Sequence, residues 1–563
     1  MDTTRFILVV ALCLVLALLW DAWQKDYGTL PSTPYTVTHK TETQKQQEQK
    51  TSIAEEAADI PQMTEKTNET KPSTANNNVG NTSELISVHT DLFNIKIDTH
   101  GGTLVDAELL KYPVSIDQPD SPVVLLSSDP EHLYIIQGGL LSNKPAPAHD
   151  ADYTFSKSQY SLHDGLDVLQ VPLYWKSDNG LVVKKIYEFY RDKYVIKVRY
   201  EVTNGSNETW SGSAYGQLQR VEVKNKSRTT HTYTGAVISS PEKRYEKISF
   251  DDIREGKLNR KITNGWAAFI QHYFETALIP GSRDKEYRYY TLYLDKQKTG
   301  GEKDRFAIGF TSPVATVSAG GVKTFEQQLY VGPKLQHRME KLAPGLELTV
   351  DYGKLWFLAK PIFWCLEKFH KLTGNWGWSI ILVTLMLKLL FYNLSAAGYR
   401  SMARMRRVQP KMLTIKERYK NDRTRMNKAM MDLYKQEKIN PLGGCFPIAI
   451  QIPVFISLYW VLLESVELRQ TGFIFWINDL SAPDPYFVLP VVMGVTMFVQ
   501  QRLNPAPMDP VQQKVMMMLP FIFTVFFAFF PSGLVLYWVV NNILSIAQQW
   551  MIARNLERSG LKK

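Results

Sequence analysis

The segment that decides the fold reads Ile380-Ile381-Leu382-Val383-Thr384-Leu385-Met386-Leu387-Lys388-Leu389-Leu390, an apolar run with one charged residue. Lys388 is ten residues from Trp378 and twelve from Arg400, so about 15–18 Å of helix separates it from either end. A charge at the centre of a bilayer costs at least ~2.5–3.5 kcal/mol. The run therefore predicts a membrane-spanning helix that carries a buried cation.

Three environments could hold this cation. A lysine stem covers only part of the distance to the membrane interface, which disfavours snorkelling. A buried ion pair needs an acid, and no Asp or Glu lies in the middle of another apolar segment, since Glu464 and Glu467 fall at the outer end of theirs. The remaining environment is a hydrated cavity that reaches the middle of the membrane.

Further apolar segments predict the rest of the membrane region. An apolar run from Phe6 to Trp20 follows Arg5, and no A-x-A-like cleavage site comes after it, so residues 1–25 predict an uncleaved signal anchor. The fold class is a membrane protein with six transmembrane α-helices, the anchor and a five-helix core at 376–552. The core spans are expected near 376–397, 446–465, 486–501, 515–531 and 533–552.

The charge between these spans predicts their orientation. The segment 400–440 contains thirteen Lys or Arg and four acids, whereas the loop 466–485 contains one basic residue, Arg469. By the positive-inside rule, 400–440 and the basic tail 553–563 are cytoplasmic, so both termini lie inside and the residues after the anchor lie outside. Cytoplasmic loops thus account for the net charge of +10, and no nucleic-acid substrate is expected.

The basic segment has helical spacing in two pieces, broken near Asn421-Asp422, which predicts a cytoplasmic helical hairpin at 400–440. Its apolar stripe consists of Met426, Met430 and Leu433. Topology and attraction to anionic lipid are the simpler role, which the sequence alone favours. Contact with the ribosome or a nascent chain is the alternative. The cations expected to carry the role of this basic hairpin are Arg404, Arg406, Arg407 and Lys411.

The residues between the anchor and the core divide into three segments. Residues 26–84 are polar and almost without aromatics, which predicts a flexible linker. Short alternating runs from 85 to 350, separated by turn signals such as Asn204-Gly205, predict a large extracytoplasmic antiparallel β-sandwich domain. That domain contains no cysteine, no clustered acid pair and no metal-ligand spacing, so no catalytic residue, metal or cofactor is expected. Residues 355–375 predict an interfacial amphipathic helix.

Polar residues recur at helical spacing on two predicted spans. On the first, Thr384, Lys388, Tyr392, Ser395 and Tyr399 share one helix face; on the last, Tyr537, Asn541, Ser545 and Gln548 do the same. Polar residues in membrane helices often only hold helices together. Two such stripes beside an unpaired cation favour a hydrated groove. Its expected members are Thr384, Lys388, Tyr392, Ser395, Gln451, Thr524, Tyr537, Asn541 and Ser545.

Several motifs resemble the YidC family of membrane insertases. They are Asn440-Pro441-Leu442-Gly443-Gly444-Cys445-Phe446-Pro447, Gln451-Ile452-Pro453, Phe530-Pro531-Ser532-Gly533-Leu534-Val535-Leu536-Tyr537 and, in the β domain, Gly265-Trp266-Ala267-Ala268-Phe269-Ile270-Gln271-His272-Tyr273-Phe274. The resemblance implies the Gram-negative form, a multi-pass protein of the inner membrane with a periplasmic domain. It implies insertion and folding of nascent membrane proteins in the bilayer, alone or beside the Sec translocon. A cation in a hydrophilic groove would attract the client's polar, often acidic, leading segment.

The chain departs from this family pattern at the buried cation. The family usually has Arg where Lys388 stands, and often Pro where Asn393 stands. Lys keeps the positive charge but loses the bidentate hydrogen bonding of a guanidinium. The resemblance therefore implies a role for the charge, not for a guanidinium.

Other functions fit the sequence less well than insertion. A secondary transporter, the main alternative, usually has internal repeats and often an acid in mid-membrane, and neither is evident here. An intramembrane protease could use Ser532, but none of the ten histidines lies in a predicted span. An ATP-driven machine would need a phosphate-binding G-x-x-x-x-G-K-[ST] motif, which the sequence lacks. The β domain alone could also be a carbohydrate-binding module.

Overall fold

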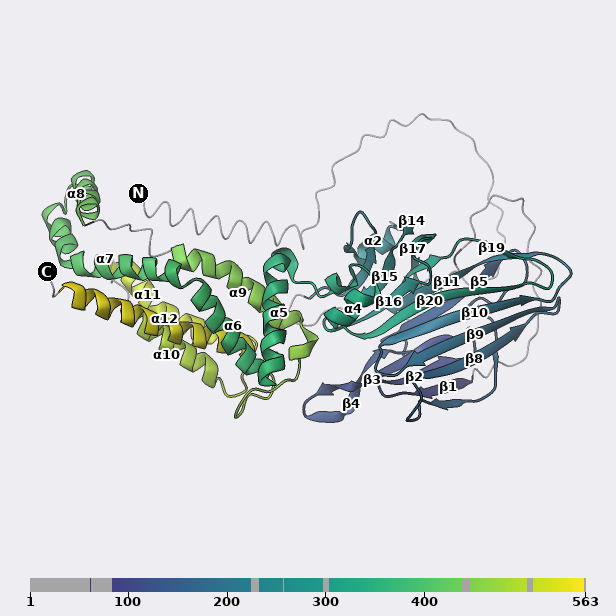
Figure 1. Ribbon diagram of the computed structural model, residues 1–563. Coiled ribbons are helices and arrows are strands. Elements are labelled where there is room, and N and C mark those ends of the chain that lie inside the picture. Colours follow the sequence, from purple (N-terminus) through teal and green to yellow (C-terminus); the bar gives the residue numbers. More distant parts are fainter. Residues whose placement is uncertain are drawn as a thin grey trace, which may run out of the picture. The chain divides into compact units, whose positions relative to one another are not determined.

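A computed structural model describes residues 61, 84–223, 232–256, 258–296, 303–437, 446–503 and 510–560. The predicted anchor 1–25, nearly all of the linker 26–84 and the motif Asn440–Cys445 lie outside these residues. The described chain consists of a β region followed by a helical region (Figure 1).

The β region consists of two sheets packed face to face (Figure 1). The first sheet has eleven strands: β1 (Leu85–His89), β2 (Phe93–Asp98), β3 (Thr103–Ser115), β4 (Gln118–Leu126), β5 (Tyr134–Ser142), β7 (Gln159–Ser161), β11 (Trp210–Val221), β14 (Asn259–Thr263), β17 (Glu286–Leu294), β18 (Arg305–Thr311) and β19 (Ala315–Val317). The second has nine: β6 (Thr154–Phe155), β8 (Val168–Lys176), β9 (Leu181–Tyr190), β10 (Val195–Asn204), β12 (Gly235–Ser239), β13 (Glu246–Ile248), β15 (Trp266–Ile270), β16 (Phe274–Pro280) and β20 (Val322–Pro333). Two short helices, α2 (Phe250–Arg254) and α4 (Gln336–Leu342), complete the region.

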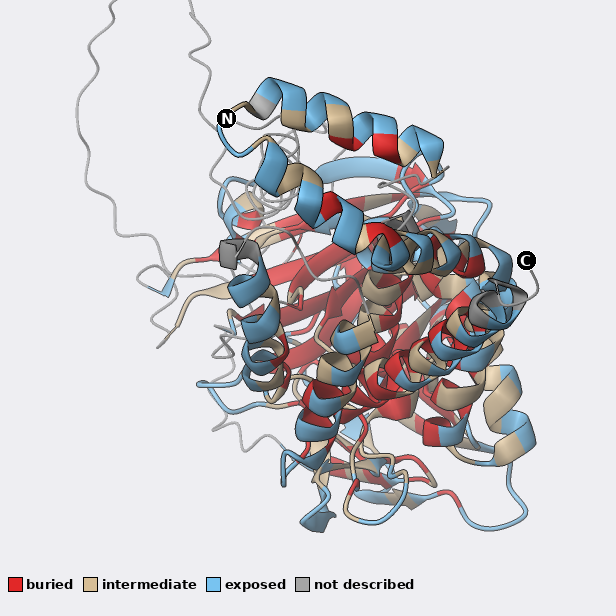
Figure 2. Cartoon of the chain, turned by 90° about the vertical axis from the view of Figure 1, so that its left-hand side faces the viewer, coloured by how far each residue is buried: buried red, intermediate tan, exposed pale blue. Residues whose placement is uncertain are grey.

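Along the strands, buried side chains alternate with more exposed ones, which explains why the two sheets pack face to face. In β10, Ile196, Val198, Tyr200 and Val202 are buried while the residues between them are half-buried or exposed. Period-two burial directs one face of each strand to a shared core. The buried residues that result are concentrated on the strands in Figure 2. The sandwich prediction is confirmed.

One pair of strands departs from the predicted antiparallel pattern. β7 lies parallel to β1, with Ser87 opposite Gln159 and His89 opposite Ser161. β7 comes after β6, a strand of the second sheet, so no hairpin turn joins it to β1 and its direction is not imposed as it is for directly consecutive paired strands. All other strand pairs among the described residues are antiparallel.

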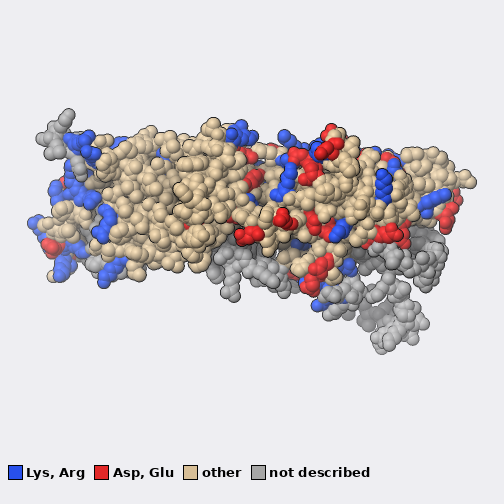
Figure 3. Space-filling view, turned by 90° about the horizontal axis from the view of Figure 1, so that it is seen from below, with Lys and Arg blue, Asp and Glu red and all other residues tan. Residues whose placement is uncertain are grey.

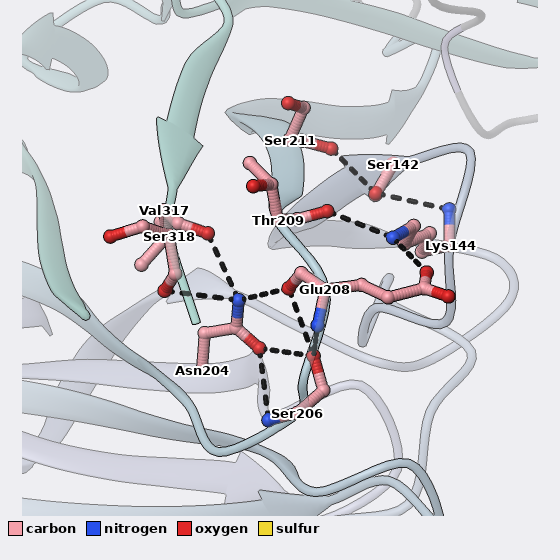
Figure 4. A network of polar contacts seen from close by, with 9 residues as sticks. All are labelled: Ser142, Lys144, Asn204, Ser206, Glu208, Thr209, Ser211, Val317 and Ser318. Atoms are coloured by element: carbon pink, nitrogen blue, oxygen red, sulfur yellow. Dashed lines mark hydrogen bonds and ion pairs between the residues drawn. The ribbon is translucent and has the colours of Figure 1, made fainter. Parts of the chain in front are cut away.

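The predicted turn at Asn204-Gly205 is held by a buried side chain (Figure 4). The Asn204 amide nitrogen donates to the carbonyls of Glu208 at 2.7 Å, Val317 at 2.9 Å and Ser318 at 3.2 Å. Its amide oxygen accepts from the Ser206 hydroxyl at 2.6 Å. Asn204 thus links the end of β10 to the end of β19.

Replacing Asn204 with alanine is expected to destabilise this end of the sandwich by about 1–3 kcal/mol, because buried carbonyl groups lose their donor. Hydrogen exchange of the amides in β19 and in residues 204–209 of the full chain would measure the loss of protection. Asn207→Ala is the matched control, since Asn207 is exposed. Equal exchange in both variants would contradict the role given to Asn204.

The helical region follows two 3-10 turns, η1 (Leu346–Thr349) and η2 (Gly353–Leu355). A third, η4 (Val466–Leu468), follows α9. By length and composition, no single helix in the described ranges could cross a membrane, whereas α6 and α7 taken together as a bent pair meet the requirement. The helices are α5 (Trp356–Thr373), α6 (Trp376–Leu390), α7 (Tyr392–Arg418), α8 (Arg423–Gln436), α9 (Phe446–Glu464), α10 (Val488–Leu503), α11 (Pro510–Phe527) and α12 (Ser532–Gly560).

The segment 376–397, predicted as a span, is not one continuous helix. The helix is broken at Phe391, where ψ is 12°, and the axes of α6 and α7 differ by 68°. Neither Pro nor Gly stands at the break, so no residue signals it in the sequence. α7 then continues into the basic segment as one helix of 27 residues. At the other end of the core, α12 continues to Gly560, past the predicted end of the last span at 552.

The basic segment contains two packed helices. Asp422 caps α8 by accepting from the Arg425 amide at 3.0 Å, next to the predicted break at Asn421-Asp422. Apolar side chains join the two helices: Val408 and Met412 from α7 pack with Met430 and Leu433 from α8. Figure 3 shows Lys and Arg gathered at the end of the helical region that contains α7 and α8, beside a stretch of surface with almost no charge.

Candidate functional site

A small cavity lies where four helices meet around Lys388. Its volume is about 30 Å³, which matches the share of one water molecule in the liquid. α6, α7, α9 and α12 all contribute to its walls. The lining residues are Thr384, Leu387, Lys388, Phe391, Leu394, Ser395, Gln451, Val454, Tyr537 and Asn541.

Lys388 is held by a neutral partner. Its ammonium group donates to the Ser545 hydroxyl at 2.7 Å, and that hydroxyl donates to the Asn541 carbonyl one turn earlier at 2.7 Å. The Tyr399 hydroxyl also bonds to Ser545. Within the described part of the chain, no acidic side chain lies within ion-pair distance of Lys388. An ammonium group has three N–H donors, so two remain for water or a client.

The other polar lining residues come from separate helices. The Gln451 amide on α9 is bonded to the Tyr537 hydroxyl on α12. Thr384 is 1% exposed, and its hydroxyl donates to the Ile380 carbonyl of its own helix at 2.6 Å. Such back-bonding satisfies the hydroxyl hydrogen but leaves an oxygen lone pair available to accept a hydrogen bond. The cavity is therefore polar on several sides and contains one cation.

Two residues expected in the groove lie elsewhere. The Tyr392 side chain is 41% exposed, and only its backbone carbonyl meets α12, where it accepts from the Gln548 amide at 3.2 Å. The bend at Phe391 explains this, since helical spacing places residues on one face only while the helix is continuous. Thr524 packs against Gly494: a methyl group at Gly494 would lie 2.0 Å from the Thr524 hydroxyl oxygen. Thr524 thus belongs to the contact between α10 and α11.

The structure also adds residues that pattern analysis missed. Leu387, Phe391, Leu394 and Val454 form the apolar walls of the cavity. Helical membrane segments consist mostly of such residues, so no signal in the sequence separates these four from their neighbours. The spacing of polar residues in the sequence identified the hydrogen-bonding groups of the cavity. Only the packing of four helices determines which apolar residues form its walls.

The four cations considered for contact with a ribosome or nascent chain are all exposed on α7. They are Arg404, Arg406, Arg407 and Lys411. Lys411 forms an ion pair with Glu437 at 2.7 Å, beyond the end of α8. This pair spans the hairpin and is solvent-exposed, so it contributes about 0–1 kcal/mol.

Both parts of the chain match known families. Residues 85–365 match the family model described as the YidC periplasmic domain, and residues 368–559 match the model described as the 60Kd inner membrane protein. The chain is 48% identical to the membrane protein insertase YidC of Methylococcus capsulatus, with 99% of each chain covered. It is 46% identical to the membrane protein insertase YidC of Nitrosococcus oceani, with all of each chain covered.

A comparison of structures gives a more distant likeness. A crystal structure described as active YidC insertase with the first transmembrane domain resolved covers 83% of this chain and 94% of its own, at 20% identity and a TM-score of 0.36. The full-length identities and the two family models are the findings that assign the family. On them, this chain belongs to the YidC family of membrane protein insertases.

Proposed function

We propose that the chain is an insertase that receives polar segments of nascent inner-membrane proteins at the cavity around Lys388. The observation that carries this proposal is a half-buried cation whose partner is a hydroxyl group rather than a carboxylate. A buried charge without a counter-ion is costly and attracts an opposite charge. An acidic side chain in the leading segment of a client supplies that charge.

The cavity, at about 30 Å³, is far smaller than a client segment, so a client enters only when the helices around it separate. Two features favour such entry. The walls near Lys388 include hydroxyl and amide groups that can bond to a client backbone. The cation itself lies between α6 and α12, where it is held by one hydrogen bond. That bond uses one of the three N–H donors of the ammonium group, so Ser545 can hold Lys388 in position while the other two donors meet a client.

The proposed function also implies how the whole chain is placed in and around the inner membrane. The anchor 1–25 and a five-helix core at 376–552 form six spans, with both termini cytoplasmic. The sandwich at 85–350 is periplasmic, and α5 lies at the membrane interface. The linker 26–84 joins the anchor to the sandwich. The Sec translocon is the proposed partner in the membrane, and the exposed cations of α7 face the ribosome or lipid. No catalytic step is proposed.

One geometric observation disfavours the protease alternative. The Ser532 hydroxyl, the only nucleophile considered for such a reaction, donates to the Asp479 carbonyl at 2.6 Å and is completely buried. Together with the Ser532 and Gly533 amides, which donate to the Ala482 and Leu480 carbonyls, it ties the turn between α11 and α12 to the loop before α10. Ser532 thus serves a structural turn.

Depletion followed by complementation tests the proposed function. Cells that lack this protein should fail to insert small membrane proteins, and a plasmid copy should restore insertion. Normal insertion in depleted cells would refute the proposal. Accumulation or loss of a small solute without an insertion defect would support the secondary transporter instead.

Replacing Ser545 with alanine is expected to lower insertion of clients with acidic leading segments by a few-fold. The reason is that one hydrogen bond to Lys388 is lost, and a single bond contributes about 0.5–1.5 kcal/mol. Ser545→Thr, which keeps the hydroxyl, is the matched variant and should insert normally. Protease protection of newly made clients measures both. An alanine variant as active as the threonine variant would show that the bond does not matter.

A further inference from the structure

A second, much larger cavity lies between the two sheets of the sandwich. Its volume is about 780 Å³, within the range of about 300–1,000 Å³ typical of ligand sites. Residues from β17, β18 and the first half of β20 line it, together with Gly281 just after β16. It lies far along the chain from Lys388, and the insertion mechanism does not use it.

Two buried polar side chains at this cavity have no partner. Gln327 is 5% exposed and makes no side-chain hydrogen bond among the described residues, and the Tyr200 hydroxyl is fully buried without a partner. Two glycines paired across β5 and β11 make room for them. A methyl group at Gly216 would lie 2.5 Å from the Gln327 amide oxygen, and one at Gly138 would lie 3.0 Å from the Tyr200 hydroxyl. Buried polar groups normally find partners, so this pair points to a ligand.

The cavity also borders an open strand edge. β16 ends at Pro280, which pairs with Gln327, and the Gly281 amide then donates to the Glu326 carbonyl at 3.1 Å. Main-chain groups of alternate residues point to the same side of a strand. Thr324 therefore presents its N–H and C=O in the same direction as Glu326, where β16 has already ended. Extended peptides bind to such edges by adding a strand.

The charge at this edge selects the peptide. Two acids line the cavity, and each is already paired: Glu286 with Lys261 at 3.1 Å, and Glu326 with Lys197 at 3.0 Å. Two further cations, Lys285 and Lys323, are exposed and form no ion pair among the described residues. The surplus charge at the opening is positive, which attracts acidic side chains.

We infer that this cavity and the adjoining edge of β20 bind an extended, acidic segment of polypeptide. The main chain of the peptide pairs with Thr324, one side chain enters the cavity towards Gln327 and Tyr200, and acidic side chains meet Lys285 and Lys323. This inference rests on the proposed function, because the occupant is a client segment that has just left the membrane on the periplasmic side.

A binding measurement on the full chain in lipid nanodiscs tests the inference. The probe is a fluorescein-labelled nine-residue peptide of alternating Thr and Glu with one central Gln, whose amide can bond to Gln327 and Tyr200, and binding is followed by anisotropy. Thr324→Pro should weaken binding at least about tenfold, because proline has no N–H to donate at the open edge. Thr324→Ala, which keeps the N–H, should bind within about twofold of the parent chain. The double variant Lys285→Glu, Lys323→Glu should no longer bind the acidic peptide. It should instead bind the same peptide with each Glu replaced by Lys.

Three results would overturn the inference. They are equal binding by the proline and alanine variants, binding that is indifferent to charge reversal, and binding of an anionic oligosaccharide in place of the peptide. Insertion in depleted cells is read separately. If clients insert normally in cells that lack the protein, the proposed function is refuted. If insertion needs the protein but the peptide does not bind, only the site on β20 is refuted.

Discussion

Replacing Lys388 with methionine is expected to lower insertion of clients with acidic leading segments by about tenfold or more. Methionine keeps an unbranched side chain only one heavy atom shorter and removes the charge. Opposite charges 4 Å apart attract by about 4 kcal/mol at an effective dielectric constant of 20, and tenfold corresponds to about 1.4 kcal/mol. Pulse labelling with protease protection of the periplasmic loops of clients would measure the loss.

The matched variants separate charge from shape. Lys388→Arg should insert within about twofold of the parent chain, since a guanidinium keeps the charge and can still donate to Ser545. Lys368→Ala, on the exposed face of α5, is the control for general loss of a cation and should have no effect. The methionine variant should lower insertion of clients with neutral leading segments less than insertion of clients with acidic leading segments. Full activity of the methionine variant on every client would remove Lys388 from the mechanism.

Replacing Lys185 with methionine is expected to destabilise the sandwich by about 2–5 kcal/mol, because backbone carbonyls in the core lose their donor. The Lys185 amine is 1% exposed and donates to the carbonyls of Gly101 at 3.0 Å, Gly102 at 2.8 Å and Gly138 at 2.9 Å. Burial lowers the pKa of Lys185 to about 7. The three acceptors oppose that shift, because only the charged ammonium has three N–H donors.

Hydrogen exchange of β5 and β9 amides in the full chain would measure this destabilisation, since exchange through opening reports local stability. Lys184→Met is the matched control. Lys184 is the next residue on β9 and points to the other face, where it is only half-buried over the Tyr174 ring. Its loss should cost less than about 0.5 kcal/mol. Equal protection in the two variants would show that the Lys185 bonds do not hold the sheets together.

The sequence alone determined the β-sandwich, because alternating burial has a period of two and the turn residues mark its limits. It also identified Lys388, because an isolated charge in an apolar run is costly wherever the run lies. Six of the nine residues expected in the groove line the cavity, and a seventh, Ser545, bonds to Lys388. These inferences share one basis: each depends on the spacing of residues within a single element.

Tertiary structure decided what spacing could not. The bend at Phe391 removed Tyr392 from the face of Thr384 and Lys388, and the close approach at Gly494 placed Thr524 between α10 and α11. The partner of Lys388 was unpredictable because Ser545 lies 157 residues away on α12. No sequence pattern predicts the cavity behind β20. It arises because β16 ends before β20 does and because the paired glycines Gly138 and Gly216 leave space. Contacts between distant segments depend on how elements pack, and one-dimensional periodicity does not contain that information.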